Sequence, residues 1–142
     1  MRGCGLSKRS SEARQGEHHI PLWANVRRDL NTAFLLSKNH DTPANHVCYH
    51  AHAAVEKASK ALLSKNHVKY PYVHDLEELF RLVSNECAPI PESYFPLLEL
   101  TSFALEFRYT IPLEPDEFPL MDVLKLSREF VEWVAEVGDF KL

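Results

Sequence analysis

The sequence predicts an all-α fold, an antiparallel up-and-down bundle of four to five helices, from three observations. Apolar residues recur at steps of three and four in several long segments, which is the period of an amphipathic helix. No segment shows sustained period-two alternation, and only one glycine, Gly138, lies beyond residue 16, so hairpin turns are scarce. Nine prolines separate the helical segments. With 142 residues and a mean hydropathy of −0.28, the chain fits one soluble domain with no membrane-spanning segment.

The elements follow in order from the apolar stripes and the prolines between them. Residues 1–19, rich in Arg, Lys, Ser and Gly, are expected to form a disordered tail, and residues 20–142 the bundle. The longest stripe is rich in alanine, which has the highest helix propensity and permits close helix packing. A long acidic loop is expected over 109–118. The expected helices are 23–37, 43–66 (the alanine-rich one), 74–86, 92–107 and 116–137.

Charge is distributed unevenly along the chain. Residues 1–74 contain 11 Lys and Arg against 5 Asp and Glu, a net charge of +6, whereas residues 75–142 contain 5 against 15, a net charge of −10. All 8 histidines also lie at or before His74. An anionic ligand is therefore expected at the N-terminal half, although two helix faces that merely differ in charge would give the same pattern.

Sequence motifs exclude several enzyme classes. The chain has no phosphate-binding glycine loop, no dinucleotide-binding glycine motif, no nucleophile elbow and no HExxH zinc motif. His46 and His50 lie four residues apart, as do His52 and Glu56, and such pairs can share a divalent metal. The two pairs point to different faces of one helix, so we expect no metal site and no cofactor, and interpret these histidines as packing or surface residues.

Two lysines lie close together on the alanine-rich helix. Lys57 and Lys60 are three residues apart with Ser59 between them, and Glu56 pairs with Lys60 in the favourable order at i,i+4. The two ammonium groups could receive a phosphate. The alternative is an ordinary solvated helix face, and either interpretation leaves both lysines exposed.

Three motifs in this order resemble the HEPN domain, a family named for nucleotide binding in higher eukaryotes and prokaryotes. They are Glu56-Lys57-x-x-Lys60-Ala-Leu-Leu, His74-Asp75-Leu76, and Arg108-Tyr109 seven residues after Thr101. The resemblance extends from about Trp23 to Val137. It implies a helical bundle that is usually dimeric and often acts beside a minimal nucleotidyltransferase, in some cases as a toxin–antitoxin pair.

The resemblance also implies a nucleotide-binding site. Lys57, Lys60, His74 and Arg108 are the expected binding residues. For His74 the alternative is a structural position before a helix, with Asp75 in the first turn. For Arg108 the alternatives are an ion pair with an acidic neighbour such as Glu106 and a bidentate contact to phosphate.

Other HEPN proteins are metal-independent ribonucleases with an Arg-x4–6-His motif, and this sequence departs from that pattern. No histidine follows His74, so none follows Arg108 at the required spacing, and the obvious acid–base group is missing. We therefore expect a non-catalytic domain that binds a nucleotide, a nucleotidyltransferase subunit, or both, with RNA as a less favoured ligand. The alternatives are a ribonuclease with atypical catalytic residues and a ligand-free oligomerisation scaffold. Three widely spaced cysteines favour a reducing, cytoplasmic location.

Overall fold

The computed structural model describes residues 19–102 and 119–141, and every regular element in these ranges is helical. The prediction of an all-α bundle is therefore confirmed. In the described residues, no helix is both long enough and apolar enough to cross a membrane. The elements in chain order are α2 (His19–Ser37), α3 (Ala44–Lys65), α4 (Leu76–Glu86), the 3-10 helix η1 (Glu92–Glu99) and α5 (Leu120–Gly138).

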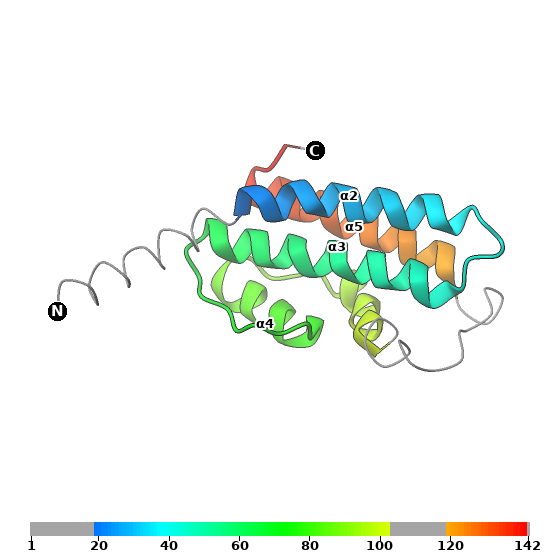
Figure 1. Ribbon diagram of the computed structural model, residues 1–142. Helices are drawn as coiled ribbons and strands as arrows, with labels where there is room; N and C mark the ends of the chain where they lie inside the picture. The colour runs from blue at the N-terminus through cyan, green and yellow to red at the C-terminus, as the bar shows by residue number, and fades with distance from the viewer. Residues whose placement is uncertain (1–18, 103–118, 142) are drawn as a thin grey trace.

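Three long helices form the body of the bundle, as Figure 1 shows. The helix α2 runs antiparallel to both α3 and α5, and its pairing with α3 is the most extensive in the fold. The shorter α4 packs on the side of α3 that faces away from α2, and η1 contacts α5 and α4. The helix α3 thus contacts α2, α4 and α5, so it lies at the centre of the bundle.

The alanine-rich stripe explains the central position of α3. Ala51, Ala54, Ala58 and Ala61 are all fully buried. Their small side chains let neighbouring helix backbones approach closely, and larger residues such as Leu62 fill the space between the helices.

The first helix begins earlier than the sequence pattern indicates. We expected helix from Trp23 and a tail that included residue 19, but α2 begins at His19. Pro21 lies in the first helical turn, where its missing N–H removes no intrahelical hydrogen bond. Residues 1–18 lie outside the described part of the chain.

The expected α-helix over 92–107 is wrong in type. Residues 92–99 form a 3-10 helix instead, with Pro96 inside it. In an α-helix the ring of Pro96 would clash with the carbonyl of residue 92, whereas its missing N–H removes one hydrogen bond in either type of helix. Helical residues continue to 102, and the rest of that expected helix and the expected acidic loop lie outside the described residues.

The end of α5 and the short segment after it contact the ends of two other helices. The indole Nε1 of Trp23 donates to the backbone carbonyl of Lys141 at 2.8 Å, and the Trp23 ring stacks on Phe140 at a centroid distance of 4.4 Å. The ammonium group of Lys65 donates to the carbonyls of Gly138 and Asp139, the last acceptors of α5. These contacts join the start of α2, the end of α3 and the end of α5.

Candidate functional site

A line of polar side chains runs along α3 beneath the connection 66–75. The line consists of His52, Glu56, Lys60 and Ser64, each four residues from the next, which places them on one face of the helix. All but Lys60 are buried. Burial of polar groups is costly unless they are hydrogen-bonded or paired, so each member needs a partner. The connection supplies these partners.

Glu56 is the centre of this polar line. Its Oε1 lies 2.6 Å from Nδ1 of His74, and its Oε2 lies 3.8 Å from Nζ of Lys60. The carboxylate therefore holds an imidazole from the connection and an ammonium group from its own helix. Sequence spacing predicted the pair with Lys60 but not the contact with His74.

His52 binds the backbone of the connection at His74. Its Nε2 donates to the backbone carbonyl of His74 at 2.9 Å and lies 3.5 Å from Oγ1 of Thr101. The Thr101 hydroxyl oxygen in turn accepts from the backbone N–H of Leu76 at 3.1 Å. The start of α4 is thus bound to α3 and to the segment after η1 through one small network.

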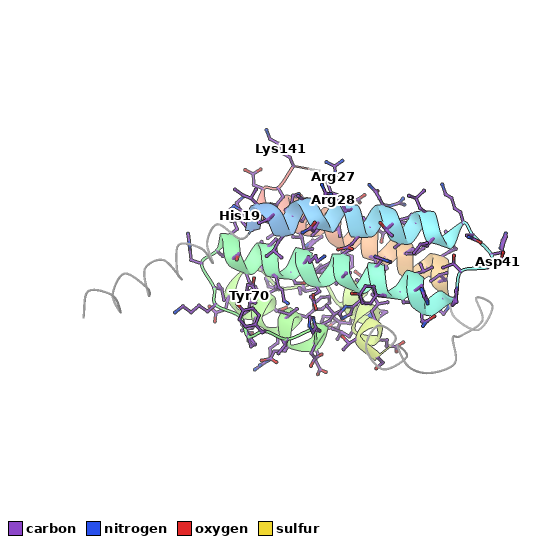
Figure 2. The ribbon with its side chains drawn as sticks, in the orientation of Figure 1. His19, Arg27, Arg28, Asp41, Tyr70 and Lys141 are labelled. Atoms are coloured by element: carbon purple, nitrogen blue, oxygen red, sulfur yellow. The ribbon has the colours of Figure 1, made fainter. Side chains whose placement is uncertain are left out.

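Tyr70 covers the other end of the line. Nζ of Lys60 lies 5.8 Å from the centroid of the Tyr70 ring, within the range of a cation–π contact, and the Tyr70 hydroxyl hydrogen-bonds to Ser64. Burial raises the pKa of this hydroxyl. Figure 2 shows Tyr70 on the α4 side of α3, whereas Arg27 and Arg28 lie on the outer side of α2.

His74 is the one member of the arrangement that solvent reaches freely. Its side chain is 64% exposed, and α4 begins two residues later, with Asp75 as N-cap accepting from the backbone N–H of Glu77. Nδ1 is the ring nitrogen that contacts Glu56, and Nε2 is the other nitrogen of the ring. Among the described residues, no hydrogen bond engages Nε2. The ring is therefore held in one orientation with one nitrogen available to a ligand.

Lys57 belongs to a different cluster, between α2 and α3. Its Nζ donates to Oδ2 of Asp29 at 2.6 Å, and Nδ1 of His50 lies 3.5 Å from Oδ1 of the same carboxylate. The structure thus brings Lys60 and His74 together around Glu56 and pairs Lys57 with α2 instead. This partner could not be predicted from helix spacing, because Asp29 lies 28 residues from Lys57.

The expectation that Lys60 is exposed needs correction. The side chain of Lys60 is only 12% exposed, so it does not lie on a solvated face. Ser59 is fully buried and donates to the carbonyl of Val55, so its hydroxyl is turned away from any ligand. Arg108 lies outside the described residues, and its role stays a prediction.

The two histidine-containing pairs of α3 face different neighbours. His50 faces α2 and His52 faces the connection, as their spacing of two residues on a helix predicts. No group of three or more potential metal ligands occurs within 19–102 and 119–141.

Sequence reasoning missed Glu56, His52 and Thr101 as organising residues. The signal that could have found them is the spacing of four between His52, Glu56, Lys60 and Ser64 on a helix otherwise rich in alanine and leucine. A polar line on a helix buried on several sides must meet polar partners.

Burial lowers the pKa of His52, although the nearby charge of Glu56 opposes the shift. His52 is therefore neutral in the folded protein at pH values where an unfolded histidine, with a pKa of about 6.5, is already protonated. The free energy of unfolding should thus decrease as the pH falls below about 6.5, by up to about 1.4 kcal/mol per pH unit for this one proton. Urea denaturation at pH 7.5, 6.5 and 5.5 measures the slope.

The matched variants are His52→Gln and His46→Gln. We expect the first to flatten the slope, because glutamine does not titrate. The second should leave the slope unchanged, because His46 is exposed. Equal slopes in the wild type and in His52→Gln would contradict the assignment.

Comparison with known proteins identifies the family. A search of curated proteins and a search of solved structures found no significant match to this chain. The sequence model described as HEPN domain matches residues 22–137, which includes Glu56, Lys60 and His74. The match covers most of the chain and agrees with the helical bundle, and the chain therefore belongs to the HEPN domain family.

Proposed function

We propose that this HEPN domain is a non-catalytic module that binds the phosphate of a nucleotide at His74. The observation that carries the proposal is the exposed His74 imidazole, which is fixed by a 2.6 Å contact between Nδ1 and the buried Glu56 carboxylate. A ring held in this way loses little conformational freedom when Nε2 meets a ligand. When protonated, it donates a charge-assisted hydrogen bond, the kind of contact that phosphate oxygens accept best.

Lys60 supplies positive charge behind His74. Its ammonium group lies between the Glu56 carboxylate and the Tyr70 ring, so it acts on a ligand through charge more than through direct contact. Lys57 is a more distant contributor, because its ammonium group is paired with Asp29. Arg108 completes the proposed set on the basis of the family resemblance.

The test is thermal unfolding with a panel of nucleoside triphosphates. A ligand that binds only the folded state stabilises it by about 2.7 kcal/mol at one hundred times its Kd. We therefore expect at least one nucleotide to raise Tm by about 5–15 °C. His74→Gln should remove most of this shift in Tm. A high salt concentration should weaken the shift, because exposed charge contacts are screened.

His46→Gln is the matched control, since His46 is an exposed histidine at the start of α3. It should keep the full shift. No shift across the panel at millimolar concentration, in folded protein, would overturn the proposal and leave the scaffold alternative.

The proposal includes a protein partner, either a second copy of this chain or a minimal nucleotidyltransferase. Support comes from the family resemblance and from exposed apolar side chains on α2 and α5, which are Ile20, Leu35, Met121 and Val137. Light scattering with and without a purified minimal nucleotidyltransferase tests this part. A monomer at high micromolar concentration that does not bind such a subunit would overturn it and leave the phosphate site untouched.

A second candidate function is cleavage of RNA without a metal ion. The observation that favours it is the same His74–Glu56 pair, because a carboxylate that orients an exposed imidazole is a general acid–base arrangement. The test is incubation of single-stranded RNA with EDTA-treated protein. Cleavage that disappears in His74→Ala and in Glu56→Gln would establish this candidate, and intact RNA would exclude it.

A further inference from the structure

The connection between α3 and α4 displays one aromatic ring to solvent. Tyr72 is 100% exposed, although tyrosine normally buries much of its apolar ring. It occupies the centre of a three-residue turn, in which the backbone N–H of Val73 donates to the carbonyl of Pro71 at 2.8 Å. Proline also restricts the backbone at the first position of this turn.

The turn is anchored on both sides. Two residues before Tyr72, the Tyr70 ring lies over Lys60 and its hydroxyl bonds to Ser64. Two residues after Tyr72, the imidazole of His74 is bound to Glu56 and the His74 carbonyl to His52. The exposed ring therefore belongs to a segment whose neighbouring residues are held to α3, so ordering the backbone of this segment for a ligand costs little conformational entropy.

Residues with basic side chains lie on both sides of Tyr72 in the sequence. His67 and Lys69 lie earlier in the same connection and are exposed, and His74 follows two residues later. Two residues of extended chain span at most about 7 Å, so one nucleotide could contact the Tyr72 ring with its base and His74 with its phosphate. Aromatic rings interleaved with cations are the pattern on which unpaired bases stack.

From this arrangement we propose that Tyr72 is a stacking platform for the nucleobase of the ligand whose phosphate His74 binds. The assignment rests on the proposed phosphate site and adds the base-binding half of it. The ligand is a base joined to a phosphate, either a free nucleotide or an unpaired residue of single-stranded RNA. Because every base has a π-face, the platform tolerates any base.

The test compares ligands with and without a base. ATP and inorganic triphosphate are titrated into the full-length protein by calorimetry, and a short oligoadenylate provides the RNA arm. We expect ATP to bind about 10-fold or more tightly than triphosphate. Tyr72→Ala should remove that difference, and Tyr72→Phe should keep it. Tighter binding of oligoadenylate than of ATP would identify RNA as the source of the base, and the reverse order would identify a free nucleotide.

Tyr49→Ala is the matched control, because Tyr49 is another exposed aromatic residue, on the first half of α3. It should not change the preference for ATP. Equal binding of ATP by the wild type and Tyr72→Ala would overturn the platform, while dependence on His74 would still support the phosphate site.

A direct readout of stacking separates the two proposals. Tyr72→Trp places an indole at the same exposed position, and a stacked base should quench its fluorescence. Quenching by adenosine, which has no phosphate, would support the platform even if triphosphate does not bind. No quenching by ATP or by oligoadenylate would overturn the platform.

Discussion

Phe130→Ala should lower the free energy of unfolding by about 3–5 kcal/mol, one of the two largest effects that we expect in this domain. Phe130 is fully buried on α5, and its ring lies 5.0 Å from that of Phe80, 5.5 Å from Tyr94 and 5.8 Å from Trp133. It therefore joins α5 to both α4 and η1, and truncation leaves a cavity where three aromatic rings meet. The midpoint of thermal unfolding should fall by roughly 10 °C or more.

Phe95→Ala is the control for this substitution. Phe95 lies on η1 next to Tyr94, but its side chain is 43% exposed, so its removal should cost under about 1 kcal/mol. Urea denaturation measures both variants. A similar cost for the two would mean that the aromatic cluster does not hold η1 and α4 to the bundle.

The helices could be predicted because the spacing of apolar residues that indicates a helix lies within each segment. The apolar stripe of α5, which includes Phe130, can be read from positions three and four residues apart, and it gave the helix to within a few residues. The 3-10 geometry of η1 was harder to predict, because it depends on how the ring of Pro96 meets the preceding turn. The contacts of Trp23 with the segment after α5 were not predictable, since 118 residues separate Trp23 from Lys141.

The site was predictable only in part, for the same reason. The motifs placed Lys60 and His74 together, and the structure joins them through Glu56. Lys57 was grouped with them by its spacing, but a carboxylate on α2 is its partner. Helix spacing defines which residues share a face, whereas ion pairs between helices depend on how the helices pack.

Glu56→Leu is the second variant from which we expect a large loss, about 2–4 kcal/mol of unfolding free energy. The substitution leaves the ammonium group of Lys60, which is 12% exposed, without its carboxylate partner. It also frees the imidazole of His74 from its anchor. An unpaired and mostly buried charge costs more than the original pair gained, because the desolvation cost remains after the attraction is lost.

The double variant Glu56→Leu with Lys60→Met tests this explanation of the loss. Replacing a buried ion pair by apolar residues of similar size is often neutral, so the second substitution should recover most of the stability lost by the first. The coupling energy from the double-mutant cycle, measured by urea denaturation, should be about 1–3 kcal/mol. Additive losses would show that the unpaired Lys60 charge is not the cause.

The same double variant separates stability from binding. It should fold, but its His74 ring has no carboxylate to orient it and no ammonium group behind it, so the stabilisation by nucleotides should disappear. A single Lys60→Met variant keeps the Glu56–His74 contact and should retain part of the shift in Tm. If the folded double variant still responds to nucleotides like the wild type, the polar line on α3 organises the fold alone, and the phosphate site lies elsewhere on the domain.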